Sequence, residues 1–247
     1  MAGKYSMDFP VPSYMVDSHY LLRPSAFMEL AQEMAMYGSL SSGFGDDVLA
    51  KDSCVWILAR MHVRFLKEVR RCDNVRMSTW HKGLQGVSFI RDYSLEDASG
   101  EAAVVSTSSW IVMNMETRRA VRSDQMGDVI PLEPQCTDSA IDEAAPKLLM
   151  PQGLVPEKAG EKRICYSDVD YNHHANNTKY VVWSMDCLPD ELVYGSRLKE
   201  ICINFIKEAR PGETVELYRL EADGAWYVEG RIGDRPIFLI KMIFGQL

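Results

Sequence analysis

The residues that could do chemistry gather in one stretch, 167–180, where carboxylates, amides and imidazoles stand directly before an apolar run. Asp170, Asn172 and His174 alternate along it. An extended backbone would therefore direct all three side chains to one side, where they could converge on a single bound group. An acid, an amide and an imidazole are groups that can activate water and move protons. We interpret this stretch as a candidate catalytic site.

The same stretch is expected to open a helix. Asn176 or Asn177 is a good N-cap, and side chains follow at helical spacing from Tyr180 to Cys187. A helix start offers unpaired backbone N–H groups and the positive end of the helix dipole, which an oxyanion or an ordered water would use. The alternative is purely structural: Asp and Asn build turns and caps, and adjacent loop histidines are usually solvated.

The elements that must position this stretch read as helices and antiparallel strands. Apolar residues of 24–40, among them Phe27, Met34 and Tyr37, fall on one face and predict a long, core-facing helix with Pro24 in its first turn. Residues 4–16 are expected to be extended, and 98–100 read as a hairpin turn. Strand-like runs occupy 55–69, 74–82, 87–96 and 102–114. The layout is α+β.

A change in composition separates the chain into two halves. Residues 128–160 lose periodicity and accumulate prolines amid acidic and small residues, which predicts a linker. We therefore expect one domain at 1–127 and a second at 161–247.

The second half repeats the first. Residues 62–70 align with 202–210 without a gap, and Phe, Lys, Glu and Arg coincide. Residues 17–29 likewise precede the first helix as 168–180 precede the second, which indicates a duplicated helix-plus-sheet unit. This alignment places three residues of the first half opposite Asp170, Asn172 and His174, namely His19, Leu21 and Arg23. Only the second copy is then equipped for chemistry.

Composition excludes several other classes of protein. The net charge of −8 argues against a nucleic-acid binder. No secretion segment and no apolar stretch long enough to span a membrane is recognised, so we expect a cytoplasmic protein. The cysteines lack paired spacing, and we expect no disulfide, no metal site and no cofactor. The cysteines are Cys54, Cys72, Cys136, Cys165, Cys187 and Cys202.

The motif from Asp168 to Tyr180, followed by Trp183, resembles the active-site motif of the acyl-acyl carrier protein thioesterases, the plant plastid enzymes and their bacterial relatives. The resemblance covers nearly the whole chain. It implies two tandem hotdog units, each a long helix packed on an antiparallel sheet. It also implies hydrolysis of fatty acyl-acyl carrier protein to a free fatty acid, with Asp170, Asn172, His174 and Glu208 catalytic. Glu208 would join from a strand at 201–210.

One departure from the family concerns cysteine. In the plant enzymes a cysteine commonly follows the glutamate, whereas this chain has Ala209, and Cys202 lies six residues before Glu208. A cysteine acyl-enzyme is therefore not expected. Asp170 or Glu208 would orient or deprotonate water, with His174 sharing proton transfer, and a covalent aspartyl intermediate stays open. The structural alternative for Glu208 is an exposed residue paired with its basic neighbours, as Glu68 in the first copy suggests.

Without a catalytic set, the first half is available for the acyl chain. Apolar side chains could line a tunnel there, although core packing is the commoner explanation for any one of them. The candidates are Phe27, Met34, Trp56, Met61 and Trp110, and Asn176 is a further substrate-binding or capping candidate. An acidic carrier protein would need a basic patch to dock. Candidates are Arg64, Lys67, Arg70 and Arg71, or Arg197, Lys199, Lys207 and Arg210.

Rival interpretations remain within and outside the enzyme class. An acyl-CoA thioesterase on the same fold is the nearest, and a hotdog dehydratase is more remote. A catalytically silent hotdog protein that binds acyl thioesters is the alternative from another class. Tandem units could pair within one chain or leave sheet edges open, so we expect a monomer or a homodimer.

Overall fold

The computed structural model describes residues 3–246. The chain divides into two compact units, Met1–Ala145 (unit 1) and Pro146–Leu247 (unit 2). The division therefore falls inside segment 128–160, which the sequence predicted to be a linker. Among the described residues, no helix is long and apolar enough to cross a bilayer.

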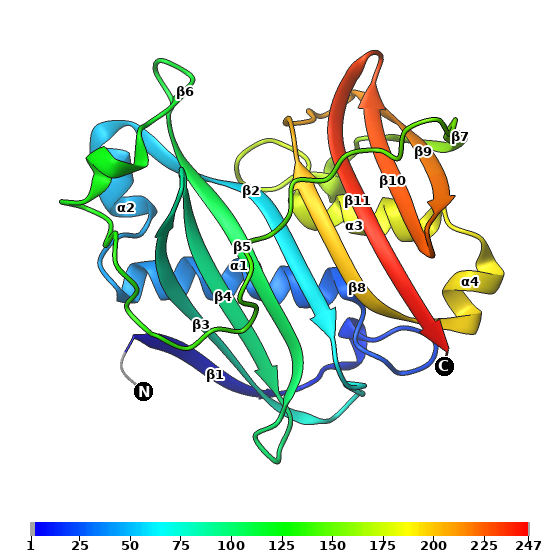
Figure 1. Cartoon of the computed structure of the whole chain (residues 1–247), viewed down its shortest axis with the longest axis horizontal. Helices are drawn as coiled ribbons and strands as arrows, with labels where there is room; N and C mark the ends of the chain where they lie inside the picture. The colour runs from blue at the N-terminus through cyan, green and yellow to red at the C-terminus, as the bar shows by residue number, and fades with distance from the viewer. Residues whose placement is uncertain (1–2, 247) are drawn as a thin grey trace. The chain divides into compact units, whose positions relative to one another are not determined.

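Unit 1 packs helix α1 (Pro24–Ser41) across one face of an antiparallel sheet (Figure 1). The strand order is β1 (Lys4–Pro10), β3 (Asn74–Gln85), β4 (Ser88–Glu96), β5 (Ala102–Asn114) and β2 (Cys54–Phe65), with β6 (Arg119–Ala120) paired to β5. Shorter helical segments are α2 (Asp46–Leu49) and the 3-10 turns Ser13–Met15, Ala50–Asp52 and Ser123–Met126. The predicted helix and strands are confirmed, but β2 ends at Phe65 rather than at residue 69.

Helix α1 begins with Pro24 at its first turn and buries most of one face. Phe27 and Met34 are fully buried, as the periodicity predicted. Tyr37 is instead 44% exposed and stacks on Tyr5 of β1, with ring centroids 6.0 Å apart. Gly38 faces the sheet at close range, because a Cβ there would stand 2.7 Å from Nη1 of Arg91 in β4. The glycine thus lets the helix approach a buried arginine.

Residues 128–145 cover unit 1 instead of linking two domains. Ile130 and Ile141 are buried. The Trp80 indole N–H donates to Asp138 O at 2.8 Å, and Ala140 N donates to Asp92 Oδ2 at 2.8 Å. Buried side chains of the sheet therefore satisfy the backbone of this segment, a kind of packing that leaves no periodicity in the sequence.

Unit 2 repeats the design with a shorter helix. Its antiparallel sheet has the order β8 (Ser196–Phe205), β11 (Arg235–Gln246), β10 (Ala225–Ile232), β9 (Thr214–Ala222) and β7 (Glu157–Arg163). The helices are α3 (Asn177–Asp186), α4 (Asp190–Gly195) and the 3-10 turn Tyr166–Asp168. Strand β7 begins inside the predicted linker. Glu208 lies beyond β8, not within a strand as expected, because Ile206 and Lys207 both donate to the single Ile237 carbonyl and the ladder stops there.

The backbone hydrogen bonds of the two units repeat each other before each long helix. In unit 1, Asp17 N donates to Leu21 O at 2.8 Å, and the matching bond of unit 2 runs from Asp170 N to His174 O at 3.0 Å. Likewise, Leu22 N donates to Val69 O at 2.8 Å in unit 1, and Ala175 N donates to Ala209 O at 2.9 Å in unit 2. The isolated bridge Val16 to Leu22 in unit 1 has its match in Val169 to Ala175. These bonds support the duplication that the sequence indicated.

The same bonds correct the alignment of the two copies by two residues. Asp170 stands where Asp17 does, so Asn172 falls opposite His19 and His174 opposite Leu21. The sequence alignment matched Asp17 with Asp168 because both are acidic. In the structure the carbonyl of Asp168 instead accepts the N–H of Asn176 before α3, as the carbonyl of Met15 accepts the N–H of the residue before α1. An aspartate at this turn is therefore common to both copies, whereas the histidine belongs to unit 2.

Candidate functional site

His174 and Glu208 form the centre of the candidate site in unit 2. His174 ends the turn before α3, and Glu208 follows β8. His174 Nε2 lies 3.0 Å from Glu208 Oε2, and the side chains are 22% and 38% exposed. An imidazole and a carboxylate at this distance can exchange or share a proton, and solvent reaches both.

Backbone bonds hold the two segments that carry this pair. Ala175 N donates to Ala209 O at 2.9 Å, so the residues next to His174 and Glu208 are tied directly. Beyond Glu208, Arg210 N donates to Glu213 Oε2 at 2.6 Å, and Arg235 pairs with the same carboxylate at 2.7 Å. The pair therefore rests on a fixed frame rather than on two loose loops.

Asp170 shapes the turn that delivers His174. Its Oδ1 accepts the N–H of Asn172 at 2.9 Å. The equivalent Asp17 accepts His19 N at 2.8 Å, which makes this bond a feature of both copies. The expected extended backbone is not found here, because the turn closes between Asp170 and His174. The argument from alternation, which required an extended backbone, therefore does not apply to this stretch, and the convergence of the three side chains stays a prediction.

Asn172 and His173 lie at the exposed tip of this turn. His173 has φ of 62°, a left-handed conformation that the equivalent Tyr20 also adopts at 63°. The turn thus imposes the backbone strain in both copies, whatever the side chain. His173 is solvent-exposed, as expected for a residue without a direct role.

Helix α3 starts as predicted, with Asn176 as its N-cap. Asn176 Oδ1 accepts the N–H of Thr178 at 2.9 Å, and its carbonyl accepts the N–H of Lys179 at 2.9 Å. These two first-turn amides are therefore already bonded. The expectation that they would complete an oxyanion hole is not met for Thr178 and Lys179.

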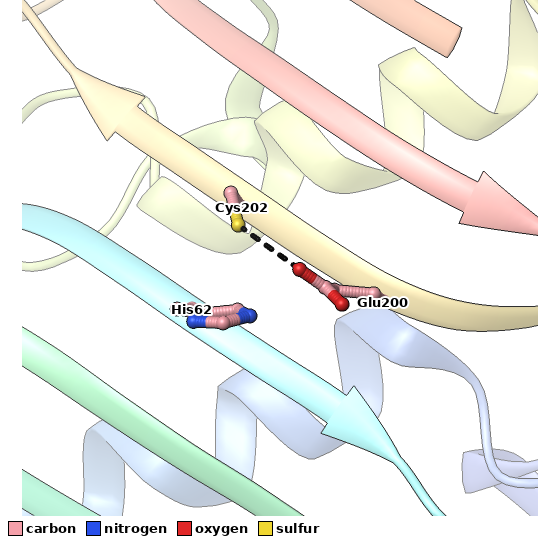
Figure 2. A group of neighbouring side chains, drawn as sticks. All are labelled: His62, Glu200 and Cys202. Atoms are coloured by element: carbon pink, nitrogen blue, oxygen red, sulfur yellow. Dashed lines mark hydrogen bonds between the residues drawn. The ribbon is translucent and has the colours of Figure 1, made fainter. Parts of the chain in front are cut away.

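None of the six cysteines lies between Asp168 and Tyr180 or directly follows Glu208. Ala209 is buried beside Glu208. Cys202 is buried in β8. Its Sγ lies 3.9 Å from Glu200 Oε1, and a dashed line joins the two side chains in Figure 2. His62, drawn in the same figure, belongs to β2 of unit 1. No residue of the family motif contributes a thiol to the candidate site.

The residues predicted to hold the acyl chain lie in the interior of unit 1. Phe27, Met34 and Met61 are buried core residues, and Trp56 and Trp110 pack on an apolar cluster that includes Phe44, Leu49, Phe89 and Ile130. Asn176 is engaged as a helix cap. These positions fit core packing, and the role in substrate binding stays a prediction.

Two of the four basic residues predicted to form a patch in unit 1 pair with acids. Lys67 bonds Asp97 at 2.9 Å and also contacts Glu101, while Arg70 bonds Glu68 at 2.5 Å. Burial is low at these pairs, so their charges remain near solvent but are locally balanced. The second candidate patch contains Lys207 and Arg210, both exposed beside Glu208.

Family models match both parts of the chain. The acyl-ACP thioesterase N-terminal domain matches residues 2–126, and the acyl-ACP thioesterase C-terminal domain matches residues 157–229. The second match contains the whole motif and Glu208.

Curated plant proteins are similar to most of this chain. Oleoyl-acyl carrier protein thioesterase 1, chloroplastic, of Arabidopsis thaliana is 30% identical over 233 residues, covering 86% of this chain and 62% of that protein. Palmitoyl-acyl carrier protein thioesterase, chloroplastic, of Cuphea hookeriana is 27% identical over 271 residues, covering 94% and 62%. The chain thus spans somewhat under two thirds of the length of these relatives.

Solved structures agree on the fold. An acyl-ACP thioesterase from Bacteroides thetaiotaomicron superposes with a TM-score of 0.89 at 19% identity, covering 98% of each chain. The 12:0-ACP thioesterase from Umbellularia californica gives 0.86 at 21% identity, covering 99% of this chain and 98% of that one. The predicted α+β fold of two tandem hotdog units is confirmed.

Proposed function

Because the chain belongs to the acyl-acyl carrier protein thioesterase family, we propose that it hydrolyses the thioester of a fatty acyl-acyl carrier protein to a free fatty acid and the holo carrier. The observation that carries this proposal is the contact of 3.0 Å between His174 Nε2 and Glu208 Oε2 in the matched C-terminal domain. An acyl-CoA thioesterase is the competing assignment that the test below separates.

In the proposed reaction, Glu208 takes a proton from a water molecule as the water oxygen attacks the thioester carbonyl. The carbon–sulfur bond then breaks. His174, whose Nε2 lies 3.0 Å from Glu208 Oε2, takes this proton from Glu208 and donates it to the leaving thiolate. One water is consumed, and a carboxylic acid and a thiol are formed. A positioned acid–base group contributes about 10²–10⁴-fold to such a step.

Asp170 and Asn172 act on the same step in this proposal. Asp170 keeps the turn closed through the Asn172 N–H, and its carboxylate orients the attacking water in this proposal. The exposed Asn172 amide holds the substrate carbonyl or the attacking water. No thiol takes part, since Ala209 follows Glu208.

Unit 1 is proposed to accommodate the acyl chain, through the apolar residues Phe27, Met34, Trp56, Met61 and Trp110. The names of the related proteins mention different acyl groups, namely oleoyl, palmitoyl and 12:0. The carrier protein is proposed to dock through Lys207 and Arg210, which are exposed on either side of Glu208. A cytoplasmic location and a monomer or homodimer stay predictions, and the matched plant proteins are named as chloroplastic.

Product identification with defined carriers tests the proposal. The purified chain is incubated with acyl carrier protein charged with acyl groups of several lengths, and with the same acyl groups on CoA. Free fatty acid and holo carrier are measured by mass spectrometry. We expect release from the carrier protein with higher kcat/KM than from CoA, and loss of release in H174A. The variant L21A, at the equivalent place in unit 1, is the matched control and should retain release.

Two results would count against the proposal. Faster turnover of every acyl-CoA than of its carrier-protein counterpart would assign the chain to CoA thioesters. Binding of acyl carriers without any release of acid would make it a silent binding protein.

A further inference from the structure

One peptide group ties together the two segments of the candidate site. It is the Ala209–Arg210 peptide, directly after Glu208. Its carbonyl accepts the N–H of Ala175, the residue after His174, at 2.9 Å. Its N–H donates to Glu213 Oε2 at 2.6 Å. A shift of this peptide would therefore move the two reacting side chains relative to each other.

Unit 1 holds the equivalent peptide with a simpler arrangement. The Val69 carbonyl accepts Leu22 N at 2.8 Å, and Arg70 N donates to Asp73 Oδ2 at 2.7 Å. Within residues 3–246, Asp73 forms no ion pair with a basic side chain. An aspartate alone is therefore sufficient to close this turn of the fold.

In unit 2 the equivalent acid is a glutamate, and an arginine is added to it. Arg235 Nη2 lies 2.7 Å from Glu213 Oε1, so the guanidinium and the peptide N–H each take one oxygen of the carboxylate. The two side chains are 37% and 31% exposed. A glutamate has one more rotatable bond than an aspartate and would hold the N–H less firmly by itself. The charge-assisted bond from Arg235 fixes its orientation.

The position of Arg235 carries the opposite charge in unit 1. Ala103 O accepts two successive N–H groups after β2, as Ile237 O does after β8, so these two residues are equivalent. Counting back two residues from each places Glu101 opposite Arg235. Glu101 contacts Lys67 instead. The fold therefore does not require an arginine here, and the arginine belongs to the copy that carries the candidate site.

We propose that Arg235 is a positioning residue for the His174–Glu208 pair. Its guanidinium orients the Glu213 carboxylate, and the carboxylate holds the N–H of the Ala209–Arg210 peptide. The carbonyl of the same peptide holds the segment of His174. This role rests on the proposed thioester hydrolysis at that pair.

The variant R235M removes the cation and keeps an unbranched side chain. The matched control is K158M in β7. Lys158 pairs with Glu216 at 2.5 Å, and Glu216 is 31% exposed, as Glu213 is. Its loss therefore deletes an ion pair of similar exposure that bonds no part of the Ala209–Arg210 peptide. Both variants are compared with the wild type in kcat, KM, melting temperature and the exchange of individual amides by NMR.

We expect kcat of R235M to fall about three- to tenfold at unchanged KM, as loss of one half-exposed charged contact in the frame would give. The amides of Ala175 and Arg210 bond on either side of the peptide, so both should exchange faster in R235M. Their equivalents in unit 1, Leu22 and Arg70, should exchange as in the wild type. K158M should match the wild type in kcat and in these amides.

A second variant tests whether Arg235 acts through the carboxylate. The double variant E213D/R235M recreates the arrangement of unit 1, where an aspartate holds the peptide N–H without a basic partner. It should recover most of the kcat that R235M loses, together with the protection of the Arg210 amide. A double variant as slow as R235M would overturn the proposal.

Wild-type kcat in R235M would also overturn it, and so would a loss of kcat that K158M shares or that accompanies faster exchange throughout unit 2. A wild-type chain inactive on every acyl thioester would instead overturn the proposed function. That failure is distinguishable, because the exchange of the Ala175 and Arg210 amides in R235M would still decide whether Arg235 holds the peptide.

Discussion

The turn at Asp170 allows the charge of its side chain to be removed without opening the backbone. Asp170 Oδ1 accepts Asn172 N at 2.9 Å, and the equivalent Asp17 Oδ1 accepts His19 N at 2.8 Å. An asparagine retains a side-chain oxygen that accepts the same N–H, so D170N should keep the turn closed. D17N makes the same exchange in unit 1, where Leu21 stands in place of the histidine, and serves as the matched control.

The expected sizes follow from these bonds. Asp and Asn satisfy such backbone N–H groups about equally well, whereas alanine costs about 1 kcal/mol. The free energy of unfolding of D170N should therefore lie within about 0.5 kcal/mol of the wild-type value. The melting temperature of unit 2 should be about 4–8 °C lower in D170A, the shift that about 1 kcal/mol gives in a unit of about 100 residues. In the proposed function the Asp170 carboxylate orients the attacking water, and the NH2 group of an asparagine cannot accept a proton from that water. Turnover of D170N should therefore fall at least about 100-fold, within the range of acid–base contributions.

Urea unfolding and steady-state turnover of one acyl carrier protein thioester measure these quantities on the same preparations. D17N should be indistinguishable from the wild type in both. Wild-type turnover in D170N would refute the reasoning, because Asp170 would then be only the turn-building residue that unit 1 also has. A loss of stability in D170N as large as in D170A would refute the assumed backbone role.

The other predictions concern unit 1. Burial lowers the pKa of His81 from 6.5 to about 4, and its Nε2 lies 2.6 Å from Pro131 O. The folded state thus disfavours protonation of His81. Its contribution to the free energy of unfolding is fully present above about pH 6.5 and is lost, by up to about 3 kcal/mol, as the pH falls towards 4. Urea unfolding at pH 5 and 7.5 should show this dependence, and H81Q should lack most of it. A Cβ at Gly38 would stand 2.7 Å from the buried Arg91 Nη1. G38A should destabilise by about 1 kcal/mol despite better helix propensity, and R91M in that background should restore stability. A more stable G38A would contradict this packing.

The sequence predicted the elements that have strong local signals. The apolar period of 24–40 and the proline at its start identify α1, and Asn176 identifies the start of α3. The gapless match of 62–70 with 202–210 identified the duplication because these residues follow the same path in both units. The meeting of His174 with Glu208 came only from the family resemblance, since no local pattern links residues so far apart in the chain.

What the sequence could not predict depends on contacts between distant residues. Segment 128–145 read as a linker because Ile130 and Ile141 are isolated apolar residues whose burial shows no period. The two-residue error in aligning Asp170 arose because side-chain identity was matched where backbone bonds define the equivalence. The same error hid the equivalence of Tyr180 with Phe27, which only the corrected register shows.

Paired kinetics of E208Q and E68Q test the central claim most directly. Glu208 contacts His174 at 3.0 Å, whereas Glu68 at the equivalent place in unit 1 bonds Arg70 at 2.5 Å. Release of fatty acid from one acyl carrier protein thioester is measured for both variants at equal folded protein. The account predicts a fall of about 10²–10⁴-fold in kcat for E208Q and wild-type kcat for E68Q. Equal rates in the two variants would contradict it.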